Sequence, residues 1–155
     1  MSTDFDEKLE ELFIDLPEPA HLTTGTAHAV QTGKLLYIGG VLPFSEGKMA
    51  SKGRVGLEVR LDNAKLAARI AAVNALAIMW KEFGGTLNKV KRIVQVTGYI
   101  ASGGEFRQHF KVMDGATELF AQIFGNAGKH ARNAIGCAAL PNDACIELSL
   151  IVEVK

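Results

Sequence analysis

The sequence has few of the residues that stabilise small proteins through covalent or metal cross-links. Only two of its 155 residues are cysteines, Cys137 and Cys145, and they lie eight positions apart. No further cysteine or histidine follows them at the spacing of zinc ligands. We therefore expect both cysteines to be reduced thiols in the protein core, and we expect no metal site.

The sequence also lacks an excess of charge and of aromatic rings. Seventeen Lys and Arg residues balance seventeen Asp and Glu residues, which gives a formal net charge of zero at pH 7. A balanced chain has no overall field that attracts polyanions. Because only 7% of the residues are aromatic, few rings could stack on nucleotide bases. The composition argues against nucleic acid as a partner.

Long hydrophobic runs are absent as well. No apolar run reaches the roughly 20 residues that a membrane-spanning helix needs. The N-terminal stretch MSTDFDEKLEELF is acidic where a signal peptide is basic and then apolar. We expect no membrane association and a cytoplasmic location. With 155 residues, 48% of them hydrophobic, the chain is long enough to fold as one domain over residues 1–155.

Helix and strand patterns are present along the whole chain. Apolar residues recur at helical spacing near the N-terminus, after Asp4 or Thr3 as a cap, and residues 1–19 are predicted to form a helical extension. The expected elements that follow are a hairpin within 27–42, a loop with a short strand within 43–56, a helix within 61–85, a strand at 90–102, a helix within 104–125, and a closing hairpin of strands 133–139 and 145–154.

The helix within 61–85 is the most regular of these elements. Asp62 or Asn63 is its expected cap, and Gly84 and Gly85 are expected to end it. Its apolar residues occupy more than one stripe, so a sheet or another subunit should cover much of its surface.

The order of elements favours an α+β fold. A strand-helix-strand unit followed by a hairpin predicts a mixed β-sheet with two helices packed on one face. The uncovered face of the sheet is not convincingly polar in the sequence, so a closed homo-oligomer that buries it is favoured over a monomer. The residues assigned to that outer face are Ile93, Val94, Val96, Ile100, Leu148, Leu150 and Val152.

Two segments carry a family likeness. The stretches TGKLLYIGGVLP and ARNAIGCAALPNDACIELSLIVEV resemble the reactive-intermediate deaminase family, also called the YjgF or Rid family, over about residues 25–154. The signature is an arginine that opens the penultimate strand, a Leu-Pro turn, and Ile-Glu in the last strand. Here these are Arg132, Leu140-Pro141 and Ile146-Glu147. The N-terminal helix makes the chain look like a longer branch of the family.

The resemblance implies a chorismate-mutase-like fold assembled as a homotrimer, with three sites in clefts between subunits. It also implies hydrolysis of small enamines and imines, of the 2-iminopropanoate type, to a 2-keto acid and ammonia, with no metal or organic cofactor. Some members of the family are described as endoribonucleases. RNA cleavage ranks third among our hypotheses, because the sequence offers neither a basic groove nor interleaved aromatics.

The resemblance further implies roles for individual residues. Arg132 would pair with the substrate carboxylate through its planar guanidinium group. Glu147 would orient or deprotonate the attacking water and pass a proton to the departing ammonia. The ligand-binding residues implied together with these are Arg132, Gly39, Gly40, Tyr99, Thr26 and Ala134.

The sequence departs from the family pattern at several positions. Thr26 stands where a tyrosine is expected, His28 replaces a glutamine, Gly39 replaces a serine, and His130 stands where a proline is common. These departures favour a second hypothesis, a trimeric protein that binds a small carboxylate such as a 2-keto acid without catalysis. A third reading of Arg132 is a salt bridge between subunits or a surface charge.

The predicted closing hairpin raises a geometric difficulty. If the chain turns at Asn142, Glu147 lies opposite Cys137 and faces away from Arg132. A bulge, a longer loop, or sites shared between subunits would be needed to bring the two side chains into one site.

Overall fold

A five-stranded sheet forms the centre of the structure, a computed structural model that describes residues 4–22 and 24–155. The elements are α1 (Phe5–Glu11), β1 (Ala29–Thr32), β2 (Leu35–Val41), β3 (Phe44–Ser45), β4 (Lys48–Met49), α2 (Leu61–Glu82), β5 (Val90–Ala101), α3 (His109–Phe124), β6 (Ala131–Cys137) and β7 (Ile146–Val154), with 3-10 turns at Gly125–Gly128 and Pro141–Asp143. The strand order in the large sheet is β1-β2-β7-β5-β6.

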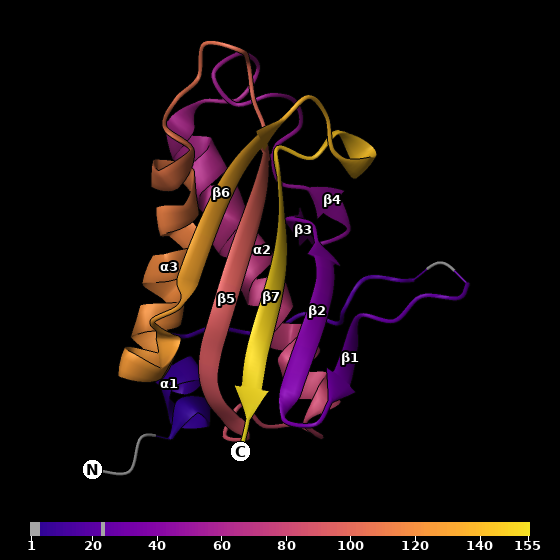
Figure 1. Cartoon of the computed structure of the whole chain (residues 1–155), viewed down its shortest axis with the longest axis vertical. Coiled ribbons are helices and arrows are strands. Elements are labelled where there is room, and N and C mark those ends of the chain that lie inside the picture. The colour runs from indigo at the N-terminus through magenta and orange to yellow at the C-terminus, as the bar shows by residue number, and fades with distance from the viewer. Residues whose placement is uncertain (1–3, 23) are drawn as a thin grey trace.

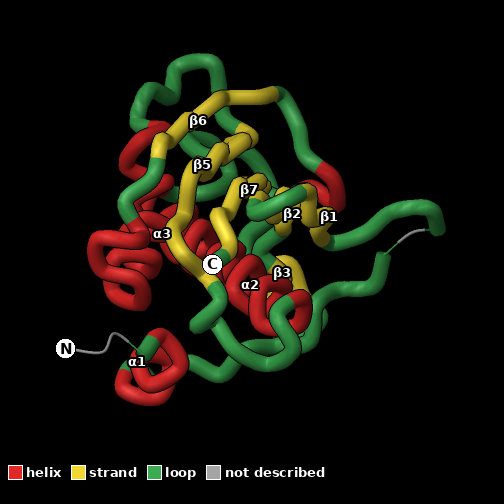
Figure 2. Tube along the Cα trace, turned by 60° about the horizontal axis from the view of Figure 1, so that its bottom comes forward, coloured by secondary structure: helices red, strands yellow, loops and turns green. Residues whose placement is uncertain are grey.

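In Figure 1, α2 lies behind the strands and α3 lies beside β6 at the left edge of the sheet, and Figure 2 shows the strands and helices as separate layers. Strands β5 and β6 are parallel, while the other neighbours in the large sheet are antiparallel. The predicted α+β fold, a mixed sheet with two helices packed on one face, is therefore confirmed.

The predicted closing hairpin is wrong. Strand β5 lies between β6 and β7 and pairs with both. A strand-helix-strand connection places its second strand parallel to the first, so β5, α3 and β6 form one such unit and β6 becomes an edge strand. The turn after β6 then carries the chain across the end of β5. Asn142 and Asp143, which both have left-handed backbone angles (φ 57° and 59°), make this turn.

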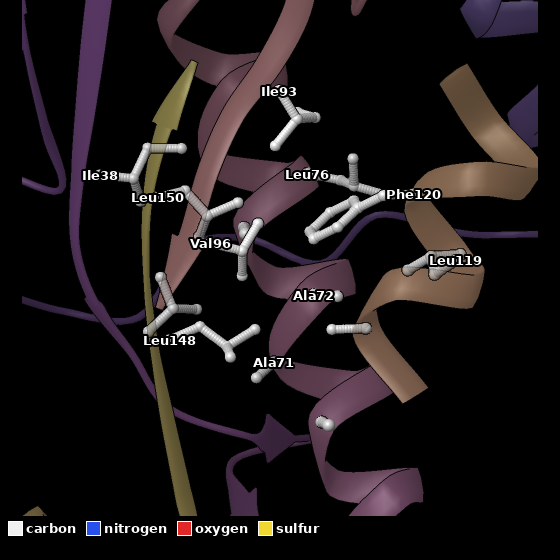
Figure 3. Close-up of a cluster of buried hydrophobic side chains, with 14 of the residues drawn as sticks. Ile38, Ala71, Ala72, Leu76, Ile93, Val96, Leu119, Phe120, Leu148 and Leu150 are labelled. Carbon is white, nitrogen blue, oxygen red and sulfur yellow. The ribbon is translucent and has the colours of Figure 1, made fainter. Parts of the chain in front are cut away.

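The residues predicted for the outer face of the sheet mostly face the helices instead. Ile93, Val96, Ile100, Leu148, Leu150 and Val152 are buried, at 0–2% exposure. Figure 3 shows four of them pointing at α2 and α3. Irregular pairing with β7 near Val90 and Ile93 shifts the alternation of β5, which the sequence pattern alone did not reveal. The prediction for these six residues is therefore wrong.

The open face of the sheet carries both apolar and polar side chains. It carries Val30, Tyr37, Tyr99 and Ile135 as exposed large hydrophobic residues, at 61%, 45%, 37% and 45% exposure. Polar side chains lie between them, because Thr97 pairs with both Ser149 and Asn133 on this face.

Helix α1 joins the core instead of standing apart as an extension. Phe5 and Leu9 are buried in the common hydrophobic cluster. The Asp4 side chain caps the helix by accepting hydrogen bonds from the N–H groups of its first turn, while Thr3, the alternative cap, lies outside the described residues. The helix ends at Glu11 and does not extend through residue 19.

Helix α2 begins at Leu61, before both residues that were predicted to cap it. Its N-cap position is Arg60, which makes no side-chain capping bond, so neither Asp62 nor Asn63 caps it. Alanines on its buried side let α3 approach closely. Gly115 of α3 lies against the α2 backbone, and a Cβ at this glycine would come 2.0 Å from the carbonyl oxygen of Lys65.

The close approach of α2 and α3 predicts a strong effect of Gly115→Ala. The added methyl group meets backbone atoms that cannot rotate away, so the helices must separate. We expect the free energy of unfolding in urea to fall by about 1–3 kcal/mol. This loss exceeds the ~1 kcal/mol by which alanine stabilises a helix relative to glycine. Gly104→Ala is the control, because a Cβ there meets no atom within 4 Å. Equal stability of the two variants would contradict the prediction.

Candidate functional site

Arg132 lies on the edge strand β6 and points toward α3. Its Nη1 donates hydrogen bonds to Asp114 Oδ1 at 2.8 Å and to Thr117 Oγ1 at 3.1 Å. The guanidinium carbon lies 5.2 Å from the centre of the Phe110 ring, within range of a cation-π interaction. The side chain of Arg132 is 22% exposed and that of Asp114 is 41% exposed. Helix α3 therefore fixes the arginine in place.

The pairing with Asp114 means that Arg132, which the resemblance assigns to the substrate carboxylate, already has a carboxylate partner in the protein. Arg132 takes part in a salt bridge, and the partner belongs to the same chain. A guanidinium group has five N–H donors, and both N–H groups of Nη1 are engaged. Within the described residues, Nη2 and Nε donate to no protein group. The guanidinium thus keeps two adjacent nitrogens that match the two oxygens of a carboxylate.

Thr117 and His130 extend the network behind Arg132. The His130 Nε2 lies 3.2 Å from Thr117 Oγ1, and its Nδ1 lies 2.6 Å from the carbonyl oxygen of Gly128. Burial of the ring, together with the charge of Arg132, lowers the pKa of His130 below its usual 6.5, although the Gly128 carbonyl acts in the opposite direction. The ring is therefore neutral at pH 7.

Glu147 lies on the opposite face of the sheet from Arg132. Tyr99 of β5 pairs with Ile135 on one side and with Glu147 on the other, so these three side chains share the open face. Arg132 precedes Ile135 by three residues of a regular strand, which places it on the helix face. One chain therefore cannot bring Arg132 and Glu147 together across the sheet.

The carboxylate of Glu147 is half-buried and makes no hydrogen bond or ion pair within the described residues. Burial raises its pKa above the usual 4.5. The side chain lies over Gly40 of β2, at a point where the pairing of β2 with β7 is irregular. Its charge also contributes, after burial, to raising the pKa of Cys137. A carboxylate with a raised pKa and no protein partner is suited to exchanging protons with a bound molecule.

The absence of a side chain at Gly40 makes room for this carboxylate. A Cβ at Gly40 would lie 1.8 Å from Glu147 Oε1. In Gly40→Ala we expect the flexible glutamate to rotate away, so the melting temperature should change little. If Glu147 transfers protons in a reaction of this protein, turnover should fall by about 10²-fold, the typical effect of displacing such a group by 1 Å. Gly104→Ala is again the control, and an unchanged kcat in Gly40→Ala would contradict this role.

The remaining predicted ligand-binding residues are scattered around these two groups. Ala134 lies on the Arg132 side of β6 and packs against the core. Thr26 is exposed in the loop before β1. Gly39 is exposed in β2, but its N–H already donates to the carbonyl oxygen of His28 at 3.1 Å. The Gly39 N–H group is therefore already engaged by the protein.

A cavity of about 640 Å³ is lined by the segment at residues 17–22, by Gly40 and Val41 at the end of β2, and by residues at 42–47. Asn74 of α2 lines it, and the amide nitrogen of Asn74 donates to the carbonyl oxygens of Leu42 and Phe44. Neither Arg132 nor Glu147 lines this cavity. Gly40 lines the cavity and also lies against the Glu147 carboxylate.

The cysteines form no disulfide bond. Cys145 is buried, and burial raises its pKa to about 11, while Cys137 is half-buried. The described residues contain no group of three or more His, Cys, Asp or Glu side chains that could hold a metal ion. Among the helices of these residues, none is long and apolar enough to cross a membrane.

Comparison with known proteins places this geometry in a family. The family model described as "YjgF/chorismate_mutase-like, putative endoribonuclease" matches residues 7–154. The chain belongs to the YjgF family. The YjgF fold accounts for the mixed sheet with its helices on one face, and it confirms the resemblance drawn from the signature around Arg132 and Glu147.

Relatives of this YjgF protein differ in how closely they match it. Protein TCP17 from Trypanosoma cruzi is 32% identical over 148 residues, covering 95% of this chain and 92% of the relative. The crystal structure of Atu1372 from Agrobacterium tumefaciens, of unknown function, is 37% identical with a TM-score of 0.90, covering 97% of this chain and 94% of that one. Escherichia coli TdcF, solved with bound serine, shares the fold at 18% identity and a TM-score of 0.62, covering 89% and 94%.

Sequence reasoning missed the partners of Arg132. Asp114 and Thr117 are three positions apart, so a helix places them on one face, and this spacing was visible in the sequence. What the sequence did not show is that the edge strand β6 runs beside that face of α3 (Figure 1).

Proposed function

We propose that this YjgF protein hydrolyses small imines and enamines of the 2-iminopropanoate type to a 2-keto acid and ammonia. The observation that carries the proposal is the Glu147 carboxylate, which is half-buried, has a raised pKa, and has no protein partner among the described residues. Such a group can take a proton from water near neutral pH and return it.

The reaction needs one water molecule and no change of oxidation state. Glu147 accepts a proton as the water oxygen bonds to the imine carbon, and the C=N double bond becomes a single bond. That proton passes to nitrogen and gives a carbinolamine with one hydroxyl and one amino group. Glu147 then takes the hydroxyl proton and passes it to the amino group, so the C–N bond breaks and ammonia leaves as the C=O bond of the keto acid forms. The Nε and Nη2 edge of Arg132 would hold the substrate carboxylate, which fixes the orientation of the reacting carbon.

A site that uses both residues has to be shared between copies of the chain. Arg132 and Glu147 lie on opposite faces of the sheet, so each copy would supply one of them to a neighbour. Two surfaces support such an assembly as a homotrimer. The first is the unpaired edge of β6, and the second is the open face with its exposed hydrophobic residues.

The proposal is tested by measuring chemistry, binding and assembly on the same preparation. Ammonia release from 2-iminopropanoate generated in the assay reports turnover, and calorimetry with 2-oxobutanoate reports binding. Sedimentation equilibrium gives the oligomeric state. Turnover by a trimer supports the proposal, whereas absence of turnover, with or without binding of 2-oxobutanoate, contradicts it.

A second candidate function is binding of a small carboxylate without catalysis. It is favoured by Thr26 and Gly39, which stand where the family pattern has a tyrosine and a serine, so the phenolic hydroxyl of the tyrosine and the hydroxyl of the serine are missing. The structure of TdcF with bound serine shows that the fold can hold an amino acid in that protein. Binding of 2-oxobutanoate without ammonia release would select this function.

Endoribonuclease activity is the third candidate. Its support is the wording of the family description and the names of structural neighbours such as the protein from Shewanella oneidensis, which is 26% identical. RNA would require a basic surface with stacking aromatics, and the balanced charge of this chain supplies little of it. Cleavage of a labelled RNA that is abolished by Glu147→Gln would support this candidate.

A further inference from the structure

Thr117 and His130 connect Arg132 to the carbonyl oxygen of Gly128, in the 3-10 turn that follows α3. We propose that His130 is a positioning residue for Arg132: its neutral ring orients the Thr117 hydroxyl group, and that oxygen holds one N–H of the guanidinium group. The inference rests on the proposed function, because it gives His130 and Thr117 a part in placing the group that would bind the substrate carboxylate.

The direction of each hydrogen bond follows from the atoms involved. The carbonyl oxygen of Gly128 can only accept, so the His130 Nδ1, at 2.6 Å, carries the proton. In a neutral ring Nε2 is then an acceptor. Thr117 Oγ1, at 3.2 Å, donates its proton to Nε2 and accepts the Nη1–H of Arg132 at 3.1 Å. Every proton of the network has one position.

Protonation of His130 disturbs this order. A protonated ring carries an N–H on both nitrogens, so Nε2 points a donor at the Thr117 oxygen. The hydroxyl hydrogen loses its acceptor, and the oxygen has to accept from both His130 and Arg132. A second positive charge also faces the guanidinium group. The hold on Arg132 is therefore expected to weaken at acidic pH.

The surroundings of His130 decide when this happens. The ring packs edge-on against Phe120, with ring centres 6.0 Å apart, and its burial holds the pKa of His130 below the usual value. The network is therefore intact at pH 7 and is lost only as the pH falls below about 6.5. The charged residues that face the network or line the surface hollow beside His130 are Arg132, Asp114, Arg92, Lys129 and Glu153.

A first experiment needs no ligand, so its result does not depend on the proposed function. Solution NMR follows the His130 ring and the Arg132 Nε–H signal in the full-length protein through a pH titration. We expect both to move with one midpoint in the wild type and in Thr117→Ser, which keeps the hydroxyl group. In Thr117→Val, which has nearly the same shape, most of the Arg132 shift should be lost. The inference is overturned if the Arg132 Nε–H shift does not change with the His130 titration in the wild type. It is also overturned if that shift changes by the same amount in Thr117→Val.

A second experiment measures binding of 2-oxobutanoate by calorimetry in the Glu147→Gln background, which removes the other group that could titrate at the site. Between about pH 8 and pH 5 the ligand stays ionised. We expect its affinity to fall about 10-fold over this range. With Thr117→Val added, the affinity should be low at both pH values, whereas Thr117→Ser should restore the wild-type profile.

The outcomes separate the two ideas. If Arg132→Ala abolishes binding and Thr117→Val binds as the protein with Thr117 does at every pH, the positioning role is wrong while Arg132 remains the ligand-binding group. If ammonia release is absent and the NMR titration still couples Arg132 to His130 through Thr117, the proposed function fails and the positioning role stands.

Discussion

Arg132→Ala is expected to reduce kcat/KM for 2-iminopropanoate by about 10²–10³-fold. A carboxylate held by two N–H groups of a guanidinium loses two charge-assisted hydrogen bonds, worth roughly 3–4 kcal/mol together. The alanine variant leaves Asp114 without its partner, but Asp114 is 41% exposed, so water can replace the arginine. Steady-state kinetics, with ammonia detection, measure the effect.

Arg132→Lys is the matched control for this substitution. Lysine keeps the positive charge but presents a single ammonium group, which cannot make two parallel hydrogen bonds to a carboxylate. We expect the lysine variant to lose most of the activity that the alanine variant loses. Circular dichroism and thermal unfolding verify that both variants fold. Activity in Arg132→Ala within a factor of about two of the wild type would remove Arg132 from the site.

Glu147→Gln is expected to lower kcat by about 10²–10⁴-fold, the usual contribution of a positioned acid or base. Glutamine has nearly the same shape, and it cannot take a proton from water. The substrate carboxylate would still meet Arg132, so KM should change much less than kcat. An unchanged kcat in this variant would show that Glu147 is a structural residue.

The pH dependence provides an independent check on Glu147. Because burial raises its pKa above 4.5, the base form is lost at a higher pH than for an ordinary glutamate. The wild-type kcat should fall as the pH drops through this raised pKa. The residual kcat of Glu147→Gln should not show this fall at acidic pH.

Glu147→Gln, which should lower kcat, should raise the free energy of unfolding at pH 7. Burial raises the pKa of Glu147 in the folded protein, so the charged carboxylate destabilises the folded protein at pH values above that raised pKa. This destabilisation disappears as the pH falls from the raised pKa to the ordinary value of 4.5, which applies to the unfolded chain. Glu147→Gln should therefore be more stable than the wild type at pH 7, and the difference should shrink toward pH 4.5. Urea unfolding at the two pH values measures it.

The sequence by itself determined most of the local structure and the family. Apolar periodicity located α2, β5, α3 and β7 to within a few residues, because a helix or strand must present its apolar side to a core whatever its neighbours are. The motif around Arg132, Leu140-Pro141 and Glu147 identified the YjgF family. The cap at Asp4 was also visible, since its hydrogen bonds go to residues close by in the chain.

Only the tertiary structure decided how these pieces meet. The sequence suggested that β6 and β7 form a hairpin, but β5 lies between them, because the strand-helix-strand crossover brings β6 back beside β5 before the chain reaches β7. This order places the Arg132 side chain of β6 against α3, and it places Glu147 on the opposite face of the sheet, over Gly40. Such contacts join residues far apart in the chain, and local patterns specify which residues are buried without specifying which partners bury them.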